Sequence, residues 1–209
     1  MTTTTPQLAD PSAWAHYDGA DHTAADNLKY VQAHAEQGNP ASVLKAMDEF
    51  ARNAGGLMHV GDDKGPIVVN DIIGNFVPSH VPSPQDPVVM VELGAFLGYS
   101  AVHFASALAN KFGKAKCATF PWKSTRNVHE GPLEEHLKGA FKDIPRIDLV
   151  FIDHVKFLYE ADARRLLESG KLYLKFVRSH PGLKSRHYET VLEYSDGKIL
   201  DGIEVSVVV

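Results

Sequence analysis

Apolar side chains follow a helical spacing in the first part of the chain. Leu44, Met47, Phe50 and Ala51 recur at intervals of three and four residues, which places them on one face of a helix. Glycines and prolines mark where such segments begin and end. The pattern predicts helices at 26–37, 43–54 and 66–76, with a loop at 57–65 and a proline-rich connector at 77–87.

From residue 87 onwards, short apolar runs alternate with helical segments. The first run, PVVMVELG, has no polar alternation and is typical of a strand covered on both faces. Such alternation predicts right-handed crossovers and a mostly parallel α/β sheet. The expected strands are 87–94, 114–120 and 147–153, and the expected helices are 99–112, 131–141 and 157–169. Two further runs, 187–194 and 199–209, flank an Asp-Gly turn and predict a C-terminal antiparallel hairpin.

Composition narrows the class of protein. The 209 residues, 44% of them hydrophobic, suit a single domain over 26–209, preceded by a disordered tail at 1–25. A net charge of −5 without a long basic run disfavours nucleic acid and anionic membranes as partners. Cys117 is the only cysteine, so we expect a reducing compartment. The sequence shows neither a signal peptide nor a long apolar span, and we expect a cytoplasmic protein without a membrane partner.

The stretch VVMVELGAFLGYSA leads from a predicted strand into a predicted helix. Gly94 and Gly98 let the backbone approach a ligand closely at the carboxyl end of the sheet, where α/β folds bind small molecules. The spacing differs from the G-x-G-x-x-G of dinucleotide-binding proteins, which disfavours a nicotinamide dehydrogenase. Glu92 at the strand tip suits a cationic ligand better than a pyrophosphate. An ordinary tight turn between strand and helix is the alternative interpretation.

The stretch IDLVFIDHVK brings an acid and an amine to the end of another predicted strand. The carboxylate of Asp153 could hold a hard cation such as Mg²⁺, which prefers oxygen ligands. Near a bound cation the pKa of Lys156 would fall, and its amine could then act as a base. The alternative is a helix-capping acid followed by a solvated lysine. Two further residues, Glu193 and Met58, also have ordinary alternatives to a functional role. Glu193 could be an exposed residue of the predicted hairpin, and Met58 a core residue.

Several segments together resemble the catechol O-methyltransferase family, whose members use S-adenosylmethionine. They are HAEQGNPASVLKAMDEF, LMHVGDDKG, VELGAFLGYSAV, LVFIDHVKFLY and HYETVLEYSDGKILDG. The resemblance implies a Rossmann-like methyltransferase sheet, shortened relative to the family, with 26–80 as a helical cap and 87–209 as the α/β core. It also implies S-adenosylmethionine and Mg²⁺ as cofactors and a small-molecule catechol as the substrate of a monomeric enzyme.

The resemblance also assigns roles to individual residues. By position, the family's cofactor contacts fall on Met58, Val60, Glu92, Gly94, Ala95, Phe96, Tyr99, Ser100, Asp153 and His154. Asp153 matches the first metal-binding aspartate as well. Lys156 matches the catalytic base, and Glu193 matches the acid that orients the second catechol hydroxyl.

Two pieces of the family pattern are missing from this chain. After Phe120 the family has an acid that binds the cofactor ribose, then a helix and a strand, whereas 121–146 has room for one crossover helix. After Gly170 the family has a strand ending in Asp-Asn, whereas here 171–178 can be interpreted as helix or strand. Only Asp153 remains of three expected metal ligands, so we expect impaired activity. A non-catalytic small-molecule-binding relative or a truncated isoform is the alternative.

Overall fold

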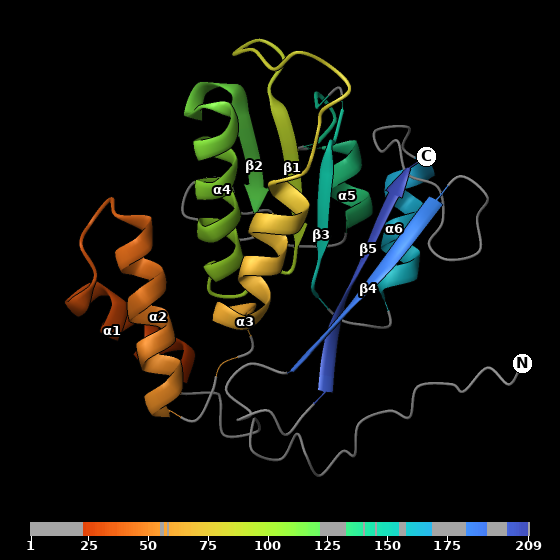
Figure 1. The fold of residues 1–209 in the computed structure, drawn as a ribbon. Helices are drawn as coiled ribbons and strands as arrows, with labels where there is room; N and C mark the ends of the chain where they lie inside the picture. Colours follow the sequence, from red (N-terminus) through yellow and green to blue (C-terminus); the bar gives the residue numbers. More distant parts are fainter. Residues whose placement is uncertain are drawn as a thin grey trace, which may run out of the picture.

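The fold is organised around strand β1 (Val88–Leu93), the middle strand of the parallel sheet (Figure 1). All six residues of this strand are buried. It pairs in parallel with β2 (Cys117–Pro121) on one side and with β3 (Leu149–Ile152) on the other, in the order β2-β1-β3. This confirms the predicted parallel sheet. The computed structural model describes residues 23–54, 57, 59–121, 133–139, 141–144, 146–154, 158–168, 183–191 and 200–208.

Alternate residues of β1 face two separate cores, which explains its unbroken apolar run. Val88 and Met90 pack towards α4 (Tyr99–Phe112), together with Phe104 and Leu108 of that helix. The other face of the strand belongs to a second core, which includes one residue each from α5 (Leu133–Lys138) and α6 (Tyr159–Glu168). Its buried members are Val89, Val91, Leu93, Leu133, Phe141, Ile144, Ile147 and Leu166. The sheet is therefore covered by helices on both faces, as Figure 1 shows.

Helices precede the sheet in the sequence. They are α1 (Thr23–His34), α2 (Pro40–Ala54), α3 (Gly61–Pro66) and a π-helix, η2 (Ile67–Ile73). The prediction of a loop over 57–65 was wrong from Gly61 onwards, because α3 begins there and runs directly into η2. The first turn of α3 contains two acids, Asp62 and Asp63, whose negative charges interact favourably with the positive end of the helix dipole. Gly65 has no side chain, and His103 of α4 packs so closely that an added Cβ would lie 2.8 Å from its ring.

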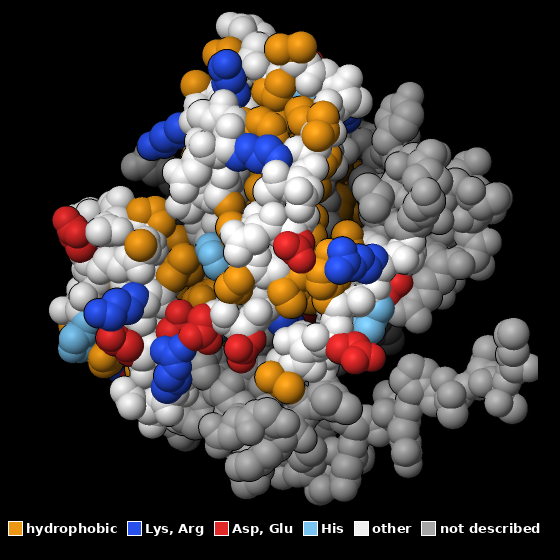
Figure 2. Space-filling view, in the orientation of Figure 1, with side chains coloured by type: hydrophobic (Ala, Val, Ile, Leu, Met, Phe, Trp, Pro, Cys, Tyr) orange, Lys and Arg blue, Asp and Glu red, His pale blue; other side chains and the backbone are white. Residues whose placement is uncertain are grey.

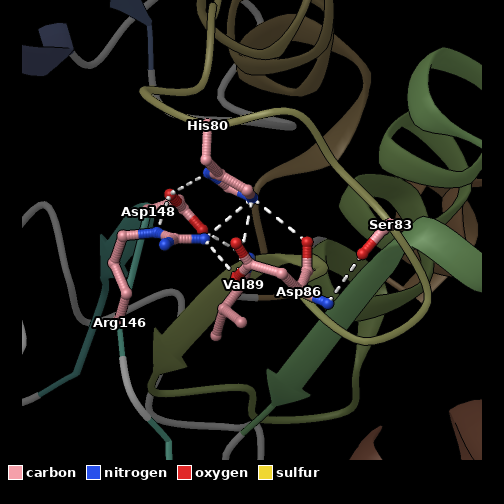
Figure 3. A network of polar contacts seen from close by, with 6 residues as sticks. All are labelled: His80, Ser83, Asp86, Val89, Arg146 and Asp148. Atoms are coloured by element: carbon pink, nitrogen blue, oxygen red, sulfur yellow. Dashed lines mark hydrogen bonds and ion pairs between the residues drawn. The ribbon is translucent and has the colours of Figure 1, made fainter.

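The connector at 77–87 is fixed to the segment just before β3 by four side chains, which we call the connector clasp: His80, Asp86, Arg146 and Asp148 (Figure 3). Arg146 donates from Nε to Asp148 at 2.8 Å and from Nη2 to Asp86 at 2.9 Å and to His80 Nε2 at 2.7 Å. Asp148, whose side chain is 3% exposed, also accepts from the backbone N–H of Val89 at 2.9 Å. The clasp thus joins the connector, β1 and the segment before β3.

The C-terminal hairpin forms a second, two-stranded sheet. Strands β4 (Leu183–Val191) and β5 (Leu200–Val208) are antiparallel, with Leu183 opposite Val208. This confirms the predicted hairpin, although β4 begins four residues before the expected position 187. The hairpin contacts the helices through an ion pair of 2.6 Å between Lys64 of α3 and Asp201 of β5. Ile203 of β5 packs against the core beneath α4.

Most other boundaries lie close to their predicted positions. Helix α4 has the predicted bounds, whereas β2 begins three residues late because 114–116 form a 3-10 turn. The predictions for 171–178 and for the turn at 195–198 fall outside the described residues. Within the described ranges, each helix is too short or too polar to cross a lipid bilayer.

Candidate functional site

Strands β1 and β3 end side by side and bring Glu92 and Asp153 to the same edge of the sheet. The parallel register places Leu93 opposite Ile152, and the backbone N–H of Asp153 donates to the carbonyl of Leu93 at 2.8 Å. Phe151 packs on the α4 side of the sheet against Phe104, with ring centroids 5.0 Å apart. Because strand residues alternate between faces, Asp153 follows on the same side as Glu92. The geometry therefore brings two of the sequence-predicted acids together.

The turn after β1 passes directly over the exit of β3. Gly94 has a φ of +101°, and a Cβ there would collide with the carbonyl oxygen of Asp153 and lie 2.8 Å from the amide nitrogen of His154. Phe96 has a φ of +43° and is 45% exposed, whereas Ala95 is buried. Gly98, with a φ of +84°, precedes the first residue of α4. The backbone at this edge is thus close-packed on one side and bears no bulky side chain at Gly94.

Glu92 is a buried acid that is only 4% exposed. Burial raises the pKa of its carboxyl group to about 7, since the charged form loses water, although the hydroxyl of Ser100 donates a hydrogen bond that opposes the shift. The negative charge of Asp153 raises the pKa further. Glu92 can therefore hold or release a proton near neutral pH, and it pairs with another sequence-predicted residue, Ser100.

Asp153 is exposed and has a phenol as a neighbour. Tyr159, at the start of α6, donates from its hydroxyl to Asp153 Oδ1 at 3.2 Å. Burial and the adjacent carboxylate raise the pKa of Tyr159, so the phenol keeps its proton and remains a donor. Tyr159 was not predicted as a site residue, because a tyrosine at the start of a helix has no sequence signature of this role.

His154 is held by an acid from α6. Its Nε2 lies 2.7 Å from Asp162 Oδ2, and Asp162 also accepts from Arg165 Nη1 at 2.7 Å. Asp162 is 6% exposed and was likewise missed in the sequence. Its spacing of three residues from Arg165 suggests a helical ion pair, but not a contact with His154.

Two sequence-predicted residues have side chains inside the core. Val60 is 3% exposed and belongs to the core beneath α4. Tyr99 is 2% exposed, stacks on His59 at 4.3 Å between ring centroids, and donates to Asp48 of α2 at 3.1 Å. Three other predicted residues, Met58, Lys156 and Glu193, lie outside the described residues, so their positions stay predictions.

The metal prediction finds limited support in the geometry. Within the described part of the chain, no group of three His, Cys, Asp or Glu side chains could hold a metal ion. Asp153 supplies one carboxylate at the sheet edge, and that carboxylate already accepts from Tyr159. Mg²⁺ sites in proteins use one or two carboxylates together with waters and substrate oxygens, so the described residues offer at most part of such a site.

A separate cavity of about 390 Å³ lies between α2, α3 and α4. Charged side chains of both signs gather over this region of the surface (Figure 2). Its lining residues are Ala41, Leu44, Lys45, Asp48, Glu49, Arg52, Asp62, Pro66, Tyr99 and His103. Tyr99 contributes to this cavity, whereas the next residue, Ser100, bonds to Glu92. Consecutive helical residues point about 100° apart, so the cavity and the acidic sheet edge lie on different sides of α4.

Comparison with known proteins identifies the family of this chain. A scan of protein-family models finds no match. A catechol O-methyltransferase of Bos taurus is 31% identical over 214 residues, covering 85% of this chain and 73% of the bovine protein. Catechol O-methyltransferase B of Danio rerio is 30% identical, covering 86% and 76%. A probable O-methyltransferase of Mycobacterium tuberculosis is 29% identical, covering 79% and 70%. The sequence match and the parallel sheet with its hairpin together show that this chain belongs to the catechol O-methyltransferase family.

Proposed function

We propose that this O-methyltransferase family member binds S-adenosylmethionine at the edge formed by Glu92, Gly94 and Asp153, and that it methylates a hydroxyl of a small catechol inefficiently. The observation that carries the proposal is the meeting of these three residues where β1 and β3 end. Ligands of α/β folds bind at the carboxyl ends of parallel strands. The relatives named as catechol O-methyltransferases support the substrate class.

The described residues fit a cofactor of this kind. When bound, S-adenosylmethionine supplies a methyl group on a positively charged sulfur. Two acids at one sheet edge suit a cation, and the absence of a side chain at Gly94 lets the turn after β1 pack directly on the backbone at the exit of β3. The proposed contacts are Met58, Val60, Glu92, Gly94, Ala95, Phe96, Tyr99, Ser100, Asp153 and His154. Because the side chains of Val60 and Tyr99 are buried in the core, we assign their contacts to the backbone.

Two residues outside the described part complete the proposal. Lys156, three positions after Asp153, acts as the base that removes a proton from the reacting catechol hydroxyl. Glu193 orients the neighbouring hydroxyl, so that the attacking oxygen lines up with the methyl group.

Low efficiency follows from the incomplete set of Mg²⁺ ligands. Asp153 alone remains of the ligands that the family resemblance implies, and the pairing with Tyr159 competes for it. The length of the alignment with the bovine protein supports the proposal that this chain lacks internal segments of the family. A comparison over 214 residues that uses 85% of a 209-residue chain leaves stretches of the bovine protein without a counterpart here.

A methyl-transfer assay tests the proposal on the full chain. With labelled S-adenosylmethionine and catechol, we expect turnover about 100-fold or more below that of the bovine relative, with little response to added Mg²⁺, since a catalytic metal contributes several kcal/mol. Lys156→Met should abolish the remaining turnover, and Lys116→Met, at an exposed position in the 3-10 turn before β2, serves as its control. Turnover equal to the bovine enzyme would contradict the impairment.

The depleted metal site also favours a second candidate, a non-catalytic relative that binds a small molecule. Calorimetry with S-adenosylmethionine separates the two. Binding without any methyl transfer supports the second candidate, and binding with slow transfer supports the first. A folded chain that does not bind the cofactor contradicts both.

A further inference from the structure

A half-buried ion pair fixes the C-terminal hairpin to α3. Lys64 Nζ donates to Asp201 Oδ2 at 2.6 Å, and the two side chains are 15% and 31% exposed. The other carboxylate oxygen, Asp201 Oδ1, accepts from the backbone N–H of Gly202 at 2.8 Å. Because water screens partly buried charges less than exposed ones, and because both oxygens of Asp201 are engaged, the contact has a defined geometry.

The ion pair lies at the end of the hairpin where β4 finishes and β5 begins. Asp201 is the second residue of β5 and lies opposite Thr190, the last residue but one of β4. Glu193, the acid that orients the catechol in the proposed function, follows Thr190 by three positions in the sequence. Lys64 therefore anchors the part of β4 that leads to Glu193.

This end of the hairpin is close to the edge where β1 and β3 finish. Burial is the main cause of the raised pKa of Tyr159, and the negative charges of Asp153 and Asp201 both add to it. Asp201 can act on Tyr159 in this way only if the two side chains lie near each other. Tyr159 in turn donates to Asp153 at the exit of β3. The ion pair thus lies near the proposed cofactor edge.

The other partner of the pair belongs to a helix that is firmly held. Val60, whose backbone is assigned to the cofactor, is the N-terminal cap residue of α3, and Lys64 lies about one helical turn later. The same helix packs closely on α4, because Gly65 has no side chain at the ring of His103. The hairpin, in contrast, forms a sheet of its own among the described residues. Lys64 therefore projects from a fixed support towards a separate unit.

We infer that Lys64 is a positioning residue, which through Asp201 holds the hairpin strand leading to Glu193 beside the cofactor edge, so that a bound catechol is received in one orientation. This inference rests on the proposed function, and it adds a residue from α3 that acts through another residue. Main-chain hydrogen bonds between β1 and β3 hold the cofactor edge itself. Loss of Lys64 should therefore weaken the binding of catechol and leave the binding of the cofactor unchanged.

Calorimetry on the full chain tests this difference. S-adenosylhomocysteine is titrated first, and catechol is then titrated into the saturated complex. For Lys64→Met we expect the affinity for catechol to fall about fivefold or more, since a loosely held group no longer meets the ligand in one orientation. The affinity for S-adenosylhomocysteine should stay within about twofold of the wild-type value, because the cofactor edge is an independent contact.

Matched variants separate the ion pair from a general loss of stability. Lys64→Arg keeps the positive charge and should bind catechol nearly as the wild type does. Asp201→Asn keeps the size of the side chain but removes its charge, and it should weaken catechol binding. In a chain that already carries Lys64→Met it should have little further effect, because both substitutions remove the same contact. Lys116→Met, at an exposed position in the 3-10 turn before β2, is the control and should bind both ligands like the wild type.

The outcomes separate this inference from the proposed function. If Lys64→Met binds catechol as tightly as the wild type, or loses affinity for both ligands by the same factor, the positioning role is wrong and the proposed function stands. If the wild-type complex does not bind catechol, the proposed function is wrong and the positioning role falls with it. If Lys64→Met fails to fold, Asp201→Asn and Lys64→Arg decide the question.

Discussion

Glu92 carries its carboxyl group where little water reaches it, and this makes the stability of the protein depend on pH. Burial is the main reason why the pKa rises from 4.5 to about 7 on folding. For an acid with a raised pKa, the unfolded chain releases its proton first as the pH rises. The folded state therefore loses stability between about pH 4.5 and 7, and the loss is complete above pH 7. The shift corresponds to about 3 kcal/mol.

Glu92→Gln should remove most of this dependence, because the amide is neutral at every pH. In urea unfolding, we expect the wild type to lose about 3 kcal/mol more than the variant between about pH 4 and pH 8. Glu135→Gln, at an exposed position in α5, is the control and should behave like the wild type. Parallel pH profiles for the wild type and Glu92→Gln would show that Glu92 ionises without penalty.

The connector clasp shows how the guanidinium group of Arg146 can hold several chain segments together. Arg146→Met would leave the buried carboxylate of Asp148 with the N–H of Val89 but without the guanidinium. We expect a loss of about 2–4 kcal/mol in the free energy of unfolding, since breaking a buried ion pair leaves an uncompensated charge.

An exposed ion pair provides the comparison for the clasp. Lys29 and Asp26 of α1 lie 3.0 Å apart, with side chains 75% and 50% exposed. Lys29→Met should cost less than about 0.5 kcal/mol, because water screens such pairs. Equal losses for the two variants in urea unfolding would mean that the clasp contributes no more than a surface pair.

The sequence predicted those elements whose signals are local. The apolar run of β1 and the glycines on either side of α4 mark these elements without reference to the rest of the chain. Helix α3 was missed, because a segment with two glycines and two aspartates resembles a loop. Gly65 has no side chain, and this allows His103 of α4 to pack closely against it. No local sequence pattern reveals such a contact.

The same distinction holds for the candidate site. Glu92 and Asp153 could be predicted because each ends an apolar run, and parallel strands end at one edge. Tyr159 and Asp162 could not, because their roles depend on how α6 packs against the end of β3. Helical periodicity alone marks these positions as ordinary residues of an amphipathic helix.

The hairpin and the parallel sheet are separate sheets among the described residues, and side chains join them. The Lys64–Asp201 pair, with side chains 15% and 31% exposed, is one such link. Lys64→Met should accelerate hydrogen exchange in β4 and β5 about fivefold, which corresponds to about 1 kcal/mol, and leave β1 unchanged.

Lys45→Met provides the control for this measurement. Lys45 pairs with Glu49 across 3.6 Å on the exposed face of α2, and its loss should not alter exchange in the hairpin. If Lys64→Met accelerated exchange equally in β1 and in the hairpin, the two sheets would open together, and the hairpin would not be an independent unit.

The bond between the Asp153 amide and the Leu93 carbonyl is made entirely by the main chain. This edge of the site is therefore held in part by backbone atoms, which most side-chain substitutions leave in place. Substitutions can remove a base or a metal ligand and still leave the same backbone shape at this edge of the site. A protein with this backbone can therefore lose catalytic activity and still bind its ligand.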